Sequence, residues 1–170
     1  TRWAQGGVAA VTASDDSFED HIQDTLNAGA GLCREDVVRM VVEQAPDRIL
    51  DLIEWGVSFD AKKSYGRTED SRSQHDLTRE GGHNKRRILH VQDRTGRAIH
   101  EALLKKCHET ENIQILEDHF VIDLLTTHKL DPSSKGINEC IGAYVLDIEG
   151  DRVFTLKSQV TVLATGGAGK

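Results

Sequence analysis

The stretch of residues 75–97 gathers side chains that could bind a small anion. One carboxylate, Glu80, stands beside the pair Gly81-Gly82. Glycine lets a backbone approach a ligand closely because it has no Cβ, and arginine holds carboxylates or phosphates through a planar fork of donors. The interspersed cations and histidines are Arg79, Lys85, Arg86, Arg87, Arg94, Arg97, His75, His83 and His90. The functional interpretation is a concave site for a small anion, and the alternative is a solvated basic loop that balances an acidic protein.

Three other chemistries fit the sequence less well. None of the eight histidines falls in an HxH or HxxxH spacing, so we expect no metal site. The sequence Gly166-Gly167-Ala168-Gly169-Lys170 is like the close of a phosphate-binding loop, but that pattern requires a glycine where Ala164 stands. Cys33, Cys107 and Cys140 lie among apolar neighbours or inside expected elements, which is typical of inert thiols rather than of a nucleophile.

The composition argues against several classes of partner. The 28 acidic and 21 basic residues give a formal net charge of -7, which disfavours non-specific binding to nucleic acid or to anionic membranes. No apolar run approaches the roughly 20 residues of a membrane helix, and the first residues lack the apolar segment of a signal peptide. An odd number of cysteines without a CxxC pair predicts free thiols in a reducing compartment.

The first half of the chain is mainly helical by pattern. Apolar spacing, capping residues and helix-stopping glycines predict helices over 17–28, 35–44, 47–55 and 95–108. Pro46 is expected to separate the second helix from the third, because an interior proline removes a backbone hydrogen bond. Thr95 is the expected cap of the fourth helix. Residues 60–74 are polar and lack apolar periodicity, so we expect a loop there.

The second half is mainly β by pattern. Strands are expected over 113–116, 120–125, 141–148, 153–156 and 160–164, in addition to a short one over 57–59. Residues 149–152 predict a hairpin turn. The apolar run 160–164, followed by Thr165-Gly166-Gly167, is typical of a parallel strand that delivers backbone N–H groups to a nucleotide. The expected fold class is therefore α/β, with α+β character within this chain.

Three motifs resemble the succinate dehydrogenase and fumarate reductase flavoprotein family. Residues 1–8, centred on Ala4-Gln5-Gly6-Gly7, resemble its flavin-contacting turn, and residues 162–167 resemble its second nucleotide-contacting strand and turn. The motif of residues 77–97 is the specific one, and it is most similar to the L-aspartate oxidase branch of the family. The motifs occur in the family's order, so the resemblance covers essentially the whole chain.

The resemblance implies part of a Rossmann-like domain that binds FAD without a covalent bond. Main-chain groups would make most of the contacts, and no metal is implied. The residues that would contact FAD are Thr1, Arg2, Trp3, Ala4, Gln5, Gly6 and Gly7, with Phe120 and Val121 at the adenine end and Ala164, Thr165 and Gly166 near the end of the chain.

The resemblance also implies an activity. The intact enzyme would oxidise L-aspartate to iminoaspartate and pass the electrons to oxygen or fumarate. The product would supply quinolinate and NAD biosynthesis in the bacterial cytoplasm, with functional coupling to quinolinate synthase as a further expectation. Glu80 would pair with the ammonium group of the substrate, which is the one positive group that distinguishes aspartate from succinate. The proton-transfer arginine is expected beyond Lys170, so no catalytic residue is expected within this chain.

The sequence leaves its domain organisation and two other functions open. Residues 1–170 are expected to be a partial FAD-binding domain and an internal piece of a longer protein. The first βαβ unit with its GxGxxG, the capping domain and the C-terminal helical domain would then lie outside it, and the piece alone would be inactive. The alternatives are a fumarate reductase or succinate dehydrogenase flavoprotein subunit, and a non-catalytic domain that binds a partner through the basic 79–97 loop.

Overall fold

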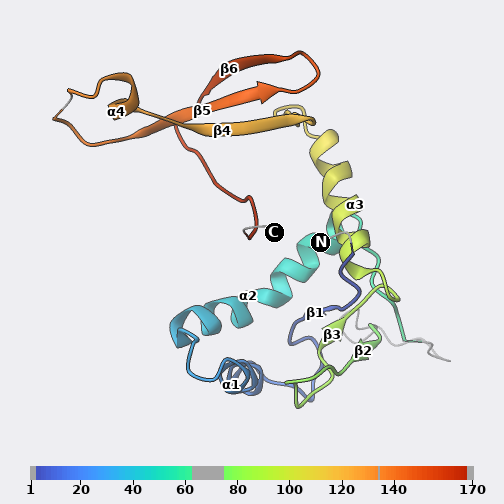
Figure 1. Cartoon of the computed structure of the whole chain (residues 1–170). Helices are drawn as coiled ribbons and strands as arrows, with labels where there is room; N and C mark the ends of the chain where they lie inside the picture. Colours follow the sequence, from blue (N-terminus) through green and yellow to red (C-terminus); the bar gives the residue numbers. More distant parts are fainter. Residues whose placement is uncertain (1–2, 63–74, 134, 168–170) are drawn as a thin grey trace. The chain divides into compact units, whose positions relative to one another are not determined.

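The chain forms two compact units in a computed structural model that describes residues 3–62, 75–133 and 135–167 (Figure 1). The first unit is Thr1–Ile113 and the second is Gln114–Lys170. Helices dominate the first unit and an antiparallel sheet dominates the second, which confirms the mixed α/β class. Residues 63–74, the greater part of the loop expected over 60–74, lie outside the described residues.

Three helices build the described part of the first unit. Helix α1 (Phe18–Ala28) begins after Ser17, whose hydroxyl accepts a hydrogen bond from the backbone N–H of Asp20, as a helix cap should. Helix α2 (Glu35–Glu54) is one continuous helix with Pro46 inside it, so the prediction of two helices was wrong. Val42 and Ile49, one on each side of Pro46, are both buried. Packing of both halves offsets the roughly 3 kcal/mol that an interior proline costs.

Helix α3 (Thr95–His108) has the expected range, but Thr95 is its first residue and not its cap. The cap position is Arg94, which makes no capping hydrogen bond with its side chain. The Thr95 hydroxyl instead accepts a hydrogen bond from the backbone N–H of Val91 at 3.0 Å. Thr95 therefore ties the start of α3 to the segment that follows the neighbouring strand.

A small sheet connects these helices. Its strands are β1 (Val8–Ala9), β2 (Leu77–Thr78) and β3 (Ile88–Leu89), antiparallel in the order β1-β3-β2. Residues 57–59 were expected to form a strand but pair with no strand among the described residues, although Val57 and Phe59 are buried. Their alternation reflects burial in the core and not strand pairing. That core consists of Ala10, Ile49, Val57, Phe59, Leu77 and Leu89.

The second unit is a three-stranded antiparallel sheet in the order β4-β5-β6. Strand β4 (His119–Thr126) leads through the short helix α4 (Thr127–Leu130) to β5 (Cys140–Asp147), and a hairpin joins β5 to β6 (Arg152–Lys157). In the hairpin turn the backbone N–H of Gly150 donates to Asp147 at 2.9 Å, which confirms the turn expected over residues 149–152.

Two further expected strands are not present as strands. Residues 113–116 and 160–164 have no strand assignment, and Val160 and Val162 are 78% and 81% exposed. A buried parallel strand needs a neighbour on each side, and no strand in the described part of the second unit pairs with residues 160–164. The apolar run therefore leaves the sheet as an extended segment (Figure 1).

Candidate functional site

The glycine turn before β1 is held between a strand and a helix. An added Cβ on Gly7 would lie 2.3 Å from the backbone oxygen of Leu89, so Gly7 is pressed against β3. On the other side of the turn, the carbonyl of Ala4 accepts a hydrogen bond of 3.0 Å from the backbone N–H of Gly96, in the first turn of α3. Only glycine allows so close an approach of two backbones. These contacts fix the inner face of the turn of residues 3–7, while Trp3 and Gln5 on the turn are exposed.

The side chain of Glu80 lies at this turn. Glu80 follows β2 by two residues, and β2 and β1 pair with opposite edges of β3. An added Cβ on Gly6 would lie 3.7 Å from each carboxylate oxygen of Glu80. The structure thus joins the expected substrate residue and the expected flavin-contacting turn, which are more than 70 positions apart in the sequence.

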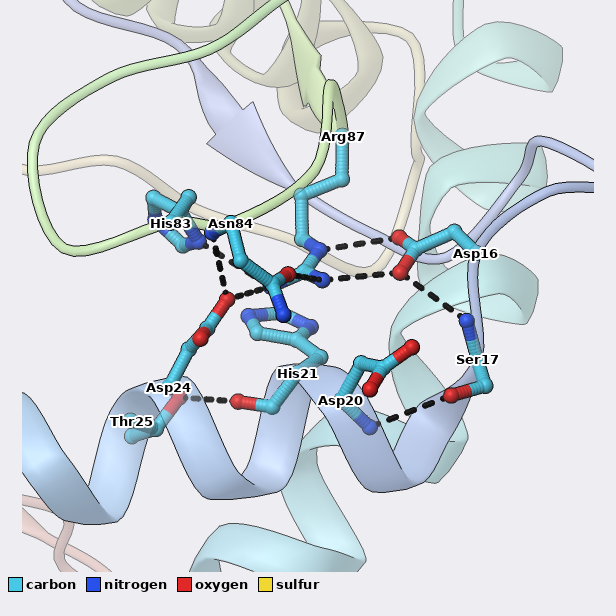
Figure 2. Close-up of polar contacts among 9 residues, drawn as sticks. All are labelled: Asp16, Ser17, Asp20, His21, Asp24, Thr25, His83, Asn84 and Arg87. Atoms are coloured by element: carbon cyan, nitrogen blue, oxygen red, sulfur yellow. Dashed lines mark hydrogen bonds and ion pairs between the residues drawn. The ribbon is translucent and has the colours of Figure 1, made fainter.

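Arg87, directly before β3, is the buried centre of the loop that carries Glu80. Its guanidinium binds Asp16 with two hydrogen bonds, of 2.8 Å from Nε and 2.7 Å from Nη2, and binds Asp24 on α1 at 2.7 Å from Nη1 (Figure 2). Nη2 also donates to the side-chain oxygen of Asn84 at 3.0 Å, and Nη1 lies 3.3 Å from Nδ1 of His83. These contacts fasten the loop to α1 and to the residues before it.

The charges in this network are held firmly. Burial alone would raise the pKa of Asp24, but hydrogen bonds from the Asn84 backbone and from Arg87 outweigh it and hold that pKa below its ordinary value. Burial acts to lower the pKa of Arg87, and its contacts with Asp16 and Asp24 raise it above the ordinary value. The lowered pKa of Asp24 and the raised pKa of Arg87 both favour the ionised pair.

His21 on α1 borders the same network. Its side chain is buried, its ring lies 5.5 Å from the ring of His83, and its Nδ1 has no hydrogen-bond partner among the described residues (Figure 2). Burial lowers the pKa of His21, and the nearby positive charge of Arg87 and the His83 ring lower it further. His21 is therefore a neutral ring packed against a charged cluster.

The other cations of the basic stretch border a hollow or pair locally. A cleft of about 550 Å³ is lined by Arg79, Lys85 and Arg86, among others. Arg86 also donates to the backbone oxygen of Leu77, and Arg97 pairs with Glu101 at 2.7 Å. With Arg87 neutralised as well, the stretch carries less free positive charge than its sequence suggests, which weakens the interpretation as a basic docking loop.

The structure describes ten of the twelve residues expected to contact FAD. Thr1 and Arg2 lie outside the described residues. In the second unit, Phe120 and Val121 are exposed on β4, and residues 164–166 are exposed in the extended segment after β6. Contact of these residues with FAD stays a prediction.

Sequence reasoning missed Asp16, Asp24 and His21. Asp16 lies next to the Ser17 cap, and Asp24 and His21 lie three residues apart on α1, so each has an ordinary local explanation. The available signal was the place of Arg87 immediately before the apolar pair Ile88-Leu89, because a cation drawn into a core by such neighbours requires acidic partners.

The geometry of residues 3–7 fits contact with a flavin cofactor. The turn has no side chain at Gly6 or Gly7, its inner face is fixed by β3, and its outer face is exposed beside a carboxylate. Such a turn can present main-chain groups to a flat ligand at close range. No group of three or more metal-binding side chains occurs in the described parts of the chain.

Comparison with known proteins identifies similar proteins over the full length of this chain. The model of a family described as FAD binding domain matches residues 1–170. The L-aspartate oxidase of Pseudomonas aeruginosa is 48% identical over 170 residues, which is 100% of this chain and 31% of that protein. The chloroplastic L-aspartate oxidase of Oryza sativa subsp. japonica is 46% identical over 169 residues, 99% of this chain and 24% of that protein. The likeness to the L-aspartate oxidases inferred from the motifs is thus confirmed.

A solved structure is also similar. A variant of the quinol fumarate reductase of E. coli superimposes with a TM-score of 0.82 at 28% identity, covering 99% of this chain and 26% of that chain. This chain therefore spans less than a third of the length of each of these relatives.

Proposed function

Because this chain belongs to the FAD binding domain family, we propose that the whole protein is an FAD-dependent oxidase that converts L-aspartate to iminoaspartate. The observation that carries the proposal is the approach of Glu80 to the glycine turn, where a Cβ on Gly6 would lie 3.7 Å from both carboxylate oxygens. A carboxylate at the edge of a flavin-contacting turn is suited to hold an ammonium group beside the cofactor. The identity of 48% to an L-aspartate oxidase supports the same reaction.

Each part of the chain has a role in this proposal. Residues 1–7 would hold FAD mainly through the main chain, and the second unit would add Phe120, Val121 and residues 164–166. When bound, FAD supplies the two-electron oxidation of the carbon–nitrogen bond of the substrate. Glu80 would accept hydrogen bonds from the substrate ammonium and so orient the carbon that is oxidised.

The same carboxylate would provide selectivity. L-Aspartate and succinate share a four-carbon dicarboxylate skeleton and differ by the ammonium group. A site that pairs one added acid with that group favours aspartate, because a substrate without it leaves the carboxylate desolvated and unpaired. Glu80 would therefore strengthen the binding of aspartate and contribute little to the binding of fumarate or succinate.

The Glu80→Gln variant of the full-length protein tests this role, because glutamine keeps the shape and removes the charge. Removing one partner of a desolvated charge pair costs about 2–5 kcal/mol, which is roughly a 30-fold to several-thousand-fold loss in kcat/KM for L-aspartate. Fumarate reduction with a reduced viologen dye should fall far less, since fumarate has no ammonium group. Glu109→Gln, at the exposed end of α3, is the matched control and should change neither rate.

A second function is a fumarate reductase or succinate dehydrogenase flavoprotein subunit, which the TM-score of 0.82 with the quinol fumarate reductase favours. Equal losses of both reactions in Glu80→Gln, or a wild-type protein that reduces fumarate without oxidising aspartate, would support it. A purified full-length protein that is colourless and takes up no FAD would instead favour a non-catalytic binding domain.

The setting of the enzyme belongs to the same proposal. We place it in the bacterial cytoplasm as a source of iminoaspartate for quinolinate and NAD biosynthesis, coupled to quinolinate synthase, with oxygen or fumarate as electron acceptor. Cys33, Cys107 and Cys140 are all free thiols, which fits a reducing compartment. In the described residues no helix is long and apolar enough to cross a membrane. The GxGxxG unit, the capping domain and a C-terminal helical domain would complete the protein.

A further inference from the structure

We infer that Arg87 is a positioning residue for Glu80: its buried ion pairs with Asp16 and Asp24 hold the turn after β2 so that the Glu80 carboxylate faces the glycine turn. The inference rests on the proposed role of Glu80. Arg87 itself is fully buried, so it acts on the substrate only through the loop that it holds.

All five N–H donors of the Arg87 guanidinium have an acceptor. Nε donates to Asp16 at 2.8 Å, Nη2 to Asp16 at 2.7 Å and to Asn84 at 3.0 Å, and Nη1 to Asp24 at 2.7 Å, with His83 Nδ1 at 3.3 Å. The fifth contact requires Nδ1 of His83 to be without a proton. A planar fork with every donor engaged fixes the orientation of its partners, which a lysine ammonium cannot do.

The partners of Arg87 reach Glu80 through short steps along the backbone. The backbone N–H of His83 donates to the carbonyl of Glu80 at 3.3 Å, and the backbone N–H of Asn84 donates to Asp24 at 2.8 Å. His83 and Asn84 are thus bound to the network through their side chains, while His83 is also bound to Glu80 and Asn84 to α1 through their backbones. The turn closes within four residues of Glu80.

The turn has little rigidity of its own. Gly81 and Gly82 form its middle, and Gly82 has a φ of +83°, a conformation that glycine adopts without strain. A Cβ on Gly82 would lie 3.7 Å from the Cβ of Ala28, so the turn rests beside the last residue of α1. Flexible glycines give the backbone many alternatives, and the Arg87 network selects one of them.

The test uses the full-length, FAD-loaded protein and the Arg87→Lys variant. Lysine keeps the charge, but its single ammonium cannot serve both carboxylates and Asn84 in the same geometry. Misplacing a substrate-orienting group by about 1 Å costs up to roughly 100-fold, so we expect kcat/KM for L-aspartate to fall about 10- to 100-fold, mainly through KM. Fumarate reduction should fall less than about threefold, because fumarate does not use Glu80.

Two further variants sharpen the comparison. Arg39→Lys is the matched control, because Arg39 also pairs with several carboxylates on α1 and α2 but is exposed and away from the turn. It should leave both rates unchanged. The double variant Arg87→Lys/Glu80→Gln should lose no more aspartate oxidation than Glu80→Gln alone, since a misplaced carboxylate and an absent one are equivalent.

The outcomes separate this inference from the proposed function. Equal losses of both reactions in Arg87→Lys, or losses that add to those of Glu80→Gln, would overturn the positioning role of Arg87. They would not affect the proposed role of Glu80 in binding the substrate. If Arg87→Lys does not fold, the Asn84→Ala variant provides the test. It removes one exposed contact of the network and should lower aspartate oxidation more than fumarate reduction. A wild-type protein that does not oxidise aspartate overturns the proposed function and this inference together.

Discussion

The replacement Gly7→Ala should break the sheet that carries the site. The added methyl carbon would lie 2.3 Å from the backbone oxygen of Leu89 and 2.3 Å from Cγ2 of Ile88. Both distances are roughly 1 to 1.5 Å inside ordinary van der Waals contact. The Ile88 side chain can rotate, but the Leu89 oxygen belongs to β3 and can move only if the pairing of Val8 with Leu89 opens.

The expected cost follows from this overlap. Overpacking of a tightly filled position costs about 1–3 kcal/mol, and loss of the β1–β3 pair adds to it. The lower chain entropy of alanine in the unfolded state returns about 0.4–1 kcal/mol. We therefore expect Gly7→Ala to lower the free energy of unfolding of the full-length protein by about 1–3 kcal/mol.

Gly6→Ala is the matched control at the neighbouring position. Its Cβ would meet only the Glu80 oxygens at 3.7 Å, an ordinary contact, so stability should be unchanged or slightly higher. The methyl group would nevertheless stand on the outer face of the turn, where FAD is expected to approach. Gly6→Ala should therefore retain its unfolding midpoint in urea and bind less FAD, as judged from the ratio of flavin to protein absorbance.

Equal stabilities of Gly7→Ala and the wild type would refute the reasoning. They would mean that β1 can move away from β3 at no cost and that the register of the small sheet does not position the glycine turn. A Gly6→Ala protein with full FAD content would show that the outer face of the turn does not contact the cofactor.

Two further predictions concern the buried network. Arg87→Met should destabilise the protein by about 3–5 kcal/mol, because it leaves two buried carboxylates without their cation, whereas Arg39→Met, at an exposed cluster, should cost less than about 1 kcal/mol; urea unfolding of the two variants measures the difference, and equal costs would contradict it. The pKa of His21 lies below its ordinary value of 6.5, first because of burial and then because of the positive charge of Arg87, so the unfolded state takes up the proton first as pH falls. Stability should therefore be highest above about pH 6.5 and should decline as the pH falls below it, and His21→Gln should show a smaller decline in thermal unfolding between pH 7.5 and 5.5 than the wild type.

Local structure was largely predictable because its causes are local. The cap of α1 at Ser17, the range of α3 and the hairpin between β5 and β6 each follow from a few neighbouring residues. Pro46 led to a wrong prediction because the backbone hydrogen bond that it removes is a local loss, whereas the packing that compensates for it involves residues far apart in the sequence. The buried residues on both sides of Pro46 belong to one face of one helix, and only the folded core shows that.

The strands expected over 120–125, 141–148 and 153–156 are confirmed as β4, β5 and β6, whereas those expected over 57–59, 113–116 and 160–164 failed for the opposite reason. An apolar run such as residues 160–164 records a tendency to be buried but does not specify a partner. The described second unit pairs its three strands in an antiparallel meander and provides none for that run. The two-residue strands around the site lie below the length at which alternation can be recognised, so the sheet that joins β1, β3 and β2 was not predictable from pattern.

The site was partly predictable in the same way. Glu80 and the glycine turn could be singled out by residue type and by resemblance, yet their proximity is visible only in the folded chain. The role of Arg87 was hidden because its cationic neighbours in sequence share its chemistry. Burial separates them: Arg87 has no exposed surface, whereas Arg79 and Arg86 are exposed.

The short strands also explain why a polar network is needed at this position. Each strand of the small sheet has two residues, and such short pairings are marginal by themselves. Burial of Leu77 and Leu89, at about 1.5–3 kcal/mol for each fully buried side chain, stabilises the strands, but it does not act on the exposed turn that follows β2. The position of Glu80 therefore depends on directional contacts, which specify geometry in a way that apolar burial does not. A buried ion-pair cluster adds little net stability compared with apolar residues of similar size, although removing only its cation is costly, so the contribution of Arg87, Asp16 and Asp24 here is the placement of one carboxylate.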